Sequence, residues 1–169
     1  NAAPAVMGGI VLIRGYEPLD LIKLPVPGNF YCAVVHPHLV VSTKEARSIL
    51  PKEIPMHAAV SQWGNVGGLV AGLCSGDIDL VGRSMRDCIA EPYRKKFIPG
   101  FDELRTRLLS EGALAMNISG SGPSVFAVAN RNDIAERVGQ AMDRHFDSLG
   151  IQHDTFVVKV SNKGARLIV

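Results

Sequence analysis

Several features that would mark a special environment are scarce or missing in this 169-residue chain. Cysteine occurs three times without a C-x-x-C pair, which argues against a disulfide framework and is typical of reduced packing residues in a cytosolic protein. No apolar run approaches the ~20 residues that a membrane helix needs. With 18 basic and 16 acidic residues, the net charge of +2 is too small to attract nucleic acid or an anionic membrane from a distance.

What remains is the composition of one ordinary globular domain. Hydrophobic residues make up 47% of the chain, which is enough for a core, and charged residues make up 20%. The first residue is Asn1 rather than methionine, and no signal-peptide pattern follows it. We therefore expect a cytoplasmic protein whose sequence here begins after processing or is part of something longer.

Short apolar runs rich in β-branched and aromatic residues predict the strands. These runs are Met7–Arg14, Phe30–Val35, Leu114–Ile118, Ser124–Ala129 and Thr155–Val160, with weaker signals at Leu21–Leu24, Leu39–Val41 and Ala165–Val169. Helical spacing and capping residues predict five helices. They are Thr43–Leu50 capped by Ser42, Met56–Ser75, a helix from Asp77 to Pro92, Phe101–Ser110 and Asp133–Leu149. Gly64, Gly67 and Gly68 in the second helix indicate close packing against another element.

From residue 30 onward the order of these elements is β-α-β-β-α-β, if consecutive helices count as one connection. This order predicts an α+β fold of the ferredoxin-like, split β-α-β type, with several helices packed on an antiparallel sheet.

One glycine-rich loop raises the question of phosphate binding. Ser119, Gly120, Ser121 and Gly122 precede Pro123 and a predicted buried strand. The P-loop pattern is excluded because no lysine follows, and the dinucleotide pattern is excluded because its glycines open a helix. The residues alone therefore favour a turn between two strands over a phosphate site.

Other polar candidates have a simpler interpretation. His36 and His38 would share one face of a strand, but no third ligand has convincing spacing, so surface histidines are favoured over a metal site. Arg47 lies on the short capped helix. Arg94 follows Pro92, which turns the chain away from the preceding helix and could aim a guanidinium at a carboxylate or phosphate. No Ser/His/Asp set and no carboxylate pair predicts a catalytic centre.

Three blocks together resemble a known family. They are Val41–Pro51, Ile89–Arg94 with Ile98–Phe101, and Ile118–Pro123, and the opening Asn1–Ala5 agrees with them. In this order and spacing they closely resemble the C-terminal half of the homoserine kinases, which belong to the GHMP kinases. The glycine loop alone would indicate only the superfamily, whereas the two arginine-containing blocks make the resemblance specific.

The resemblance implies a reaction and a site. Members transfer the γ-phosphoryl group of MgATP to the side-chain hydroxyl of L-homoserine, on the way to threonine. Arg47 and Arg94 match positions that hold the carboxylate of the amino acid, and Asn1 matches a substrate-contacting asparagine. Ser119–Gly122 matches a loop that lies against the main phosphate loop. No residue of this chain is nominated as a catalytic base or metal ligand.

The resemblance also implies that parts of the active site lie outside this chain. The main phosphate loop, the Mg²⁺ ligands and the nucleotide-base pocket belong to an N-terminal half that would precede Asn1. We expect residues 1–29 to be a remnant of that domain with the connector, and 30–169 to be the C-terminal domain. Met7–Arg14 would then be exposed or paired with another copy, and a homodimer is a further possibility. The alternatives are another small-alcohol GHMP kinase, or a stand-alone module that binds an amino acid for regulation.

Overall fold

The computed structural model describes residues 2–167. Its helices are α1 (Ala2–Met7), α2 (Thr43–Ser48), α3 (Met56–Ser75), α4 (Ile78–Ser84), α5 (Glu91–Arg94) with the 3₁₀ turn η1 (Lys95–Phe97), α6 (Phe101–Ser110) and α7 (Asn132–Ser148). Its strands are β1 (Ile10–Tyr16), β2 (Leu19–Leu24), β3 (Tyr31–Pro37), β4 (Ala115–Ile118), β5 (Val125–Ala129) and β6 (His153–Lys159). No helix among these residues is both long and apolar enough to cross a bilayer.

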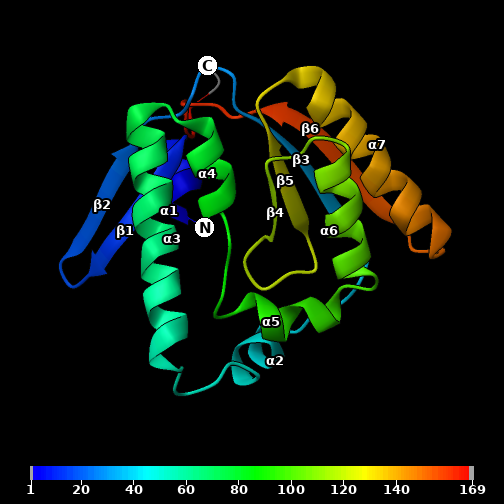
Figure 1. Ribbon diagram of the computed structural model, residues 1–169, viewed down its shortest axis with the longest axis horizontal. Coiled ribbons are helices and arrows are strands. Elements are labelled where there is room, and N and C mark those ends of the chain that lie inside the picture. Colours follow the sequence, from blue (N-terminus) through cyan, green and yellow to red (C-terminus); the bar gives the residue numbers. More distant parts are fainter. Residues whose placement is uncertain (1, 168–169) are drawn as a thin grey trace.

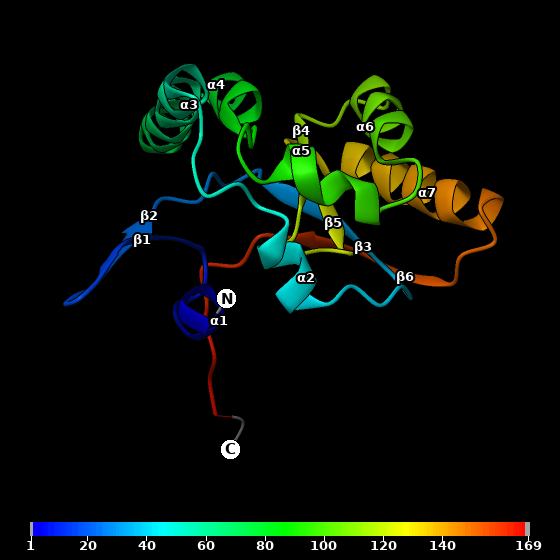
Figure 2. The same cartoon turned by 90° about the horizontal axis from the view of Figure 1, so that it is seen from below.

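A four-stranded sheet with the order β4-β5-β3-β6 forms the centre of the molecule, and every neighbouring pair is antiparallel. Helices α6 and α7 cover one face of this sheet (Figure 2). The core between them contains fully buried Val35, Leu104, Val125, Met142 and Phe146. The order of strands and helices confirms the predicted α+β, ferredoxin-like arrangement.

Capping side chains fix where two of the helices begin. The Ser42 hydroxyl accepts a hydrogen bond from the backbone N–H of Glu45 at 3.3 Å, as the capping-box pattern predicts. The Asp77 carboxylate does the same for Leu80 at 2.9 Å. Both caps satisfy N–H groups that the first helical turn leaves without partners, so the predicted start points are confirmed.

A second layer stands beside the central sheet (Figure 1). Strands β1 and β2 form an antiparallel hairpin, which packs with α3 and α4 around a core that includes Leu24, Leu73 and Val81. Strand β1 thus pairs with β2 of the same chain along one edge, and the expectation that its other edge is exposed or paired with another copy stays a prediction. Helix α1, at the start of the chain, was not predicted.

The predicted helix from Asp77 to Pro92 was wrong in its second half. Helix α4 ends at Ser84, and polar side chains from neighbouring elements hold the backbone that follows. Gln62 accepts from the N–H of Cys88 at 2.8 Å, Asn65 donates to the carbonyl of Arg86 at 3.0 Å, and Asn117 donates to the carbonyl of Met85 at 3.0 Å. These bonds replace helical ones, so residues 85–90 run as a connecting segment between the two layers.

Other strand and core predictions also failed locally. Leu39–Val41 forms no strand, because the chain turns at once after β3 and the N–H of Leu39 bonds the carbonyl of Pro37. Leu149, which the apolar spacing of the predicted helix Asp133–Leu149 places on its inward face, is instead 44% exposed just after the end of α7. Residues 165–167 have no regular structure, and the remainder of the strand predicted there lies outside the described residues.

The glycines of α3 divide into two kinds. A Cβ added to Gly72 would lie 2.9 Å from the backbone N of Val81, and one added to Gly68 would lie 2.4 Å from the Ser84 hydroxyl. Gly64 and Gly67 have no atoms within 4 Å of such a Cβ. Close packing, predicted for Gly64, Gly67 and Gly68, is therefore confirmed for Gly68 alone, and Gly72 provides a second close contact with α4.

Alanine substitution should separate these two kinds of glycine. Gly72→Ala is expected to destabilise the fold by about 1–3 kcal/mol, because the new methyl group cannot fit against α4 without a shift. Gly64→Ala is the matched control on the same helix and should stabilise it by up to about 1 kcal/mol. Urea unfolding of the two variants and the parent measures both changes, and a destabilising Gly64→Ala would contradict the assignment.

Burial also affects a thiol on the central sheet. Cys32 lies on β3, and burial raises the pKa of its thiol from 9.0 to about 11. In the folded chain at pH 8, Cys32 should therefore react with iodoacetamide at least tenfold more slowly than in urea, and its rate should keep rising until about pH 11. Peptide mass spectrometry of labelled protein measures this, and equal rates at pH 8 with and without urea would contradict it.

Candidate functional site

Arg94 joins three segments that are far apart in the sequence. From α5, its Nε donates to the carbonyl of Ala46 in α2 at 3.2 Å, and its Nη1 donates to the carbonyl of Gly120 at 3.0 Å. Helices α2 and α5 and the loop between β4 and β5 accordingly lie at one end of the molecule (Figure 1). We call this arrangement the Arg94 junction.

The junction contains most of the site residues predicted from the sequence. Arg47 directly follows Ala46, and its exposed side chain has no hydrogen bond or ion pair to any of the described residues. The structure therefore brings Arg94 and Ser119–Gly122 together with the segment of α2 that carries Arg47. Asn1, the remaining predicted contact, lies outside the described residues.

The glycine loop is a hairpin connection between adjacent antiparallel strands. Gly120 and Gly122 have φ of +61° and +83°, a region that favours glycine. The N–H of Ser119 donates to the carbonyl of Ser124 at 2.8 Å, and the N–H of Gly122 donates to that of Ser119 at 3.0 Å. Among the described residues, no protein acceptor faces the amides of Gly120 and Ser121, so both remain available to an anion.

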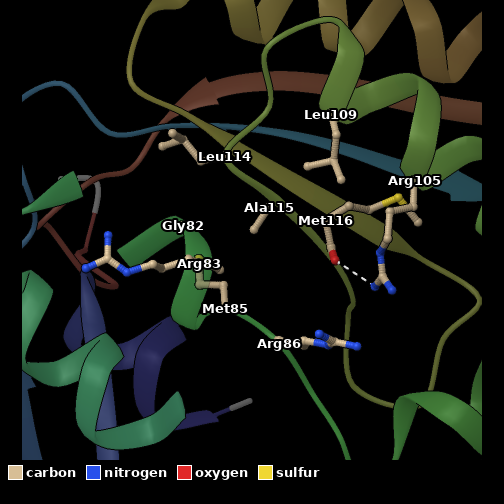
Figure 3. Close-up of a pocket in the computed structure, with 9 residues that line it drawn as sticks. All are labelled: Gly82, Arg83, Met85, Arg86, Arg105, Leu109, Leu114, Ala115 and Met116. Carbon is tan, nitrogen blue, oxygen red and sulfur yellow. Dashed lines mark hydrogen bonds between the residues drawn. The ribbon is translucent and has the colours of Figure 1, made fainter. Parts of the chain in front are cut away.

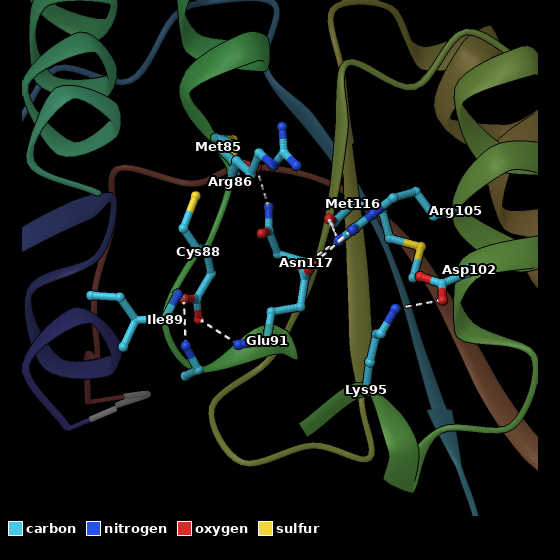
Figure 4. Close-up of polar contacts among 12 residues, drawn as sticks. Met85, Arg86, Cys88, Ile89, Glu91, Lys95, Asp102, Arg105, Met116 and Asn117 are labelled. Atoms are coloured by element: carbon cyan, nitrogen blue, oxygen red, sulfur yellow. Dashed lines mark hydrogen bonds and ion pairs between the residues drawn. The ribbon is translucent and has the colours of Figure 1, made fainter. Parts of the chain in front are cut away.

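Helix α5, which carries Arg94, is fixed at its start by Asp87. The two carboxylate oxygens accept hydrogen bonds from the backbone N–H groups of Ile89, Ala90 and Glu91 at 2.8, 2.8 and 3.2 Å (Figure 4). An acidic cap at the first turn also suits the helix dipole. This role of Asp87 was not predicted, although an aspartate shortly before a Glu-Pro pair is a recognisable helix-start signal.

The same helix is fixed laterally by a buried ion pair. Glu91 is only 7% exposed, and both of its oxygens accept from the Arg105 guanidinium, one of them at 2.7 Å from Nη1. Arg105 also donates to the carbonyl of Met116 in β4 at 3.0 Å (Figure 3). The pair thus connects α5, α6 and β4. No local pattern could have indicated it, because the partners are 14 positions apart.

A cleft of about 270 Å³ lies beside this ion pair, between α4, α6 and β4. Its polar lining consists of arginines, and Figure 3 shows Arg86 and Arg105 reaching toward the same region while Arg83 points away. Neither Arg94 nor the glycine loop lines it. The cleft is therefore a feature separate from the Arg94 junction.

The two histidines of β3 and its end have different partners. His36 bonds the Ser124 hydroxyl at 2.8 Å, and His38 bonds the Asp154 carboxylate at 2.8 Å. The His38 hydrogen bond lowers the pKa of Asp154 below its ordinary value. Within residues 2–167, no group of three or more His, Cys, Asp or Glu side chains is placed to hold a metal ion.

Known proteins resemble this chain in both sequence and fold. The family profile described as "GHMP kinases C terminal" matches residues 69–148. The homoserine kinases of Chlorobium phaeobacteroides (strain BS1) and Chlorobaculum tepidum are 48% and 49% identical to it over 170 residues. The crystal structure of homoserine kinase from Cytophaga hutchinsonii matches 97% of the chain with a TM-score of 0.94 and 53% identity.

Residues 69–148 of the chain belong to the GHMP kinase C-terminal family. The chain covers 53% of the Chlorobium homoserine kinase, 52% of the Chlorobaculum one and 52% of the Cytophaga structure. It therefore spans about half the length of these relatives. L. major mevalonate kinase, at 16% identity and a TM-score of 0.69, shares the fold alone. The resemblance read from the arginine and glycine blocks is thereby confirmed at the level of the family.

The Glu91–Arg105 pair should be essential for stability. Arg105→Met is expected to destabilise the chain by about 3–5 kcal/mol, because it leaves the Glu91 carboxylate buried without a partner. Adding Glu91→Gln should recover part of this loss. The matched control is Asp102→Asn, which removes the more exposed ion pair to Lys95 and should cost no more than about 1 kcal/mol. Urea unfolding measures all three, and similar losses for Arg105→Met and Asp102→Asn would contradict the assignment.

Proposed function

We propose that this chain is the C-terminal domain of a homoserine kinase, which in its full-length form transfers the γ-phosphoryl group of ATP to the side-chain hydroxyl of L-homoserine. The observation that carries the proposal is the Arg94 junction. It unites the three sequence blocks by which the family was recognised. The identity of 48% to homoserine kinases, spread over 99% of the chain, supports the same acceptor.

Arg94 and Arg47 are proposed to bind the carboxylate of homoserine. The two contacts of Arg94 are to neutral carbonyls, so its guanidinium is oriented while its charge stays available to an anion. Nη2 of Arg94 has no partner among the described residues. Together with the exposed Arg47, it could provide the charge-assisted hydrogen bonds that hold a carboxylate firmly.

The glycine loop is proposed to lie next to the nucleotide phosphates in the full-length protein. Its carbonyl at Gly120 is held by Arg94, and the free amides of Gly120 and Ser121 suit a phosphate oxygen. The preceding half would supply the main phosphate loop, the base pocket and the Mg²⁺ ligands. When bound, Mg²⁺ would neutralise charge on the transferring phosphoryl group.

The first test is kinetic and uses the full-length protein. Arg47→Ala should raise KM for L-homoserine by about 10–100-fold, since a hydrogen bond to a charged group contributes about 1.5–3 kcal/mol. KM for ATP and the thermal midpoint should hardly change, because Arg47 has no partner within the described part of the fold. Lys44→Ala on the same helix is the control and should leave both constants unchanged. An unaltered KM for homoserine in Arg47→Ala would contradict the proposed role.

The second test concerns the acceptor. A panel of small alcohols offered to the full-length protein should give the highest kcat/KM for L-homoserine, and Arg47→Ala should reduce this preference. The 169-residue chain alone should show no ATP-dependent phosphorylation of homoserine, because phosphoryl transfer needs the missing phosphate loop and metal. A higher kcat/KM for another alcohol would instead favour a different GHMP kinase. Turnover by the isolated chain would contradict the proposal that the preceding half supplies the main phosphate loop and the Mg²⁺ ligands.

A further inference from the structure

Two arginines line the cleft between α4, α6 and β4, and they differ in how their charge is compensated. The Arg105 guanidinium is paired with the buried carboxylate of Glu91. The exposed side chain of Arg86 has no hydrogen bond or ion pair to any residue within 2–167. Its backbone is nevertheless held, because Asn65 donates to its carbonyl at 3.0 Å. Arg86 is therefore a positioned cation without a counter-ion in the described part of the chain.

The acidic side chains near these arginines gather on the side away from the cleft. Arg86 and Arg105 also line a neighbouring pocket of about 360 Å³ between α5 and α6. Asp87, Glu91 and Asp102 line that pocket with them. The cleft of about 270 Å³, in contrast, has no acidic residue in its described lining. The positive charge of Arg86 is therefore uncompensated toward the cleft.

The remainder of the cleft is mainly apolar. Figure 3 shows Leu109 and Leu114 on one side of it and Arg86 on the other. The carbonyl of Met116, in the edge strand β4, already accepts a hydrogen bond from Arg105 at 3.0 Å, so it needs no donor from a ligand. The cleft thus has one cationic end and one apolar end.

We propose that this cleft binds a small amphipathic carboxylate, with its carboxylate on Arg86 and a short hydrocarbon chain against Leu109 and Leu114. A planar guanidinium can donate two parallel hydrogen bonds to a carboxylate, and Arg105 adds a second positive charge nearby. The volume of the cleft lies just below the roughly 300–1,000 Å³ of sites for drug-sized ligands, which favours a smaller molecule. The site is separate from the Arg94 junction, which does not line the cleft.

We expect the cleft to remain accessible in the full-length protein. Helices α4 and α6, which flank it, lie on the same side of the molecule, whereas α1 lies on the opposite side (Figure 2). In the longer relatives, sequence that precedes this domain would connect through α1, away from the cleft. The measurements below therefore use the full-length protein.

The first test compares three probes by saturation-transfer NMR titration. Hexanoate should bind with a dissociation constant on the order of 1 mM, as expected for a ligand of few atoms. The neutral analogue hexanamide should bind at least ~10-fold more weakly, because it cannot make the charge-assisted hydrogen bonds. Acetate should also bind at least ~10-fold more weakly, because it lacks the hydrocarbon chain. Equal affinities for hexanoate and hexanamide would overturn the proposal.

The second test changes the cationic end. Arg86→Gln should raise the dissociation constant of hexanoate at least ~10-fold. Arg83→Gln is the matched control, because it removes the same charge from α4 but its side chain points away from the cleft (Figure 3), so the change should stay below ~3-fold. Both side chains are exposed, so both variants should keep the thermal midpoint of the wild type. Equal losses in the two variants would show a general effect of charge and would contradict the assigned site.

The third test changes the apolar end and does not depend on Arg86. Leu109→Asn should reduce the preference for hexanoate over acetate at least ~3-fold, since less apolar surface remains to cover the chain. Leu149→Asn is the matched control, because Leu109 and Leu149 are 45% and 44% exposed but only Leu109 lines the cleft. An unchanged preference in Leu109→Asn would overturn the proposed orientation of the ligand.

A carboxylate could also bind at the Arg94 junction, and Arg47→Ala separates the two sites. This variant should leave the dissociation constant of hexanoate within ~3-fold of the wild type, because Arg47 lies outside the cleft. Loss of hexanoate binding in Arg47→Ala, with none in Arg86→Gln, would place the ligand at the junction. That result would overturn the cleft site and leave the proposed kinase function untouched, whereas an unaltered KM for homoserine in Arg47→Ala would affect only the latter.

Discussion

The Arg94 junction depends on how firmly α5 is held. This helix is only four residues long, too short to be stable by its own hydrogen bonds. Asp87 caps its start, and the Glu91–Arg105 pair fixes it against α6 and β4. Arg94 can therefore bring α2 and the glycine loop together with little loss of side-chain freedom on ligand binding, which is the advantage of a preorganised site.

The connecting segment before α5 links this site to the second layer. Gln62 and Asn65 of α3 bind the backbone of Cys88 and Arg86, and Asn117 of β4 binds that of Met85 (Figure 4), which is why α4 stops at Ser84. These two side chains of α3 face inward although they are polar, while Val60 and Trp63 of the same helix are exposed. Because its polar side chains are used to position the segment, its apolar ones are left on the outside.

Local signals predicted much of the fold but less of the site. The boundaries of α3, the Ser42 and Asp77 caps and the order of helices and strands along the chain follow from periodicity and capping, which are properties of neighbouring residues. The end of α4 and the Glu91–Arg105 pair could not be predicted, because both depend on contacts between distant segments. The roles of Arg47, Arg94 and the glycine loop came only from the resemblance, and the contacts of Arg94 with α2 and the loop required coordinates.

The two kinds of unpartnered surface on this domain call for two kinds of partner. At the Arg94 junction the free groups are donors, the guanidiniums and the amides of Gly120 and Ser121, and such groups suit anionic ligands that water would otherwise solvate. On α3 the free groups are apolar, and water solvates them poorly, so they favour a protein surface. Since Gln62 and Asn65 of α3 hold the backbone of residues 86–88, the architecture that builds the junction also leaves apolar side chains of α3, such as Val60 and Trp63, exposed.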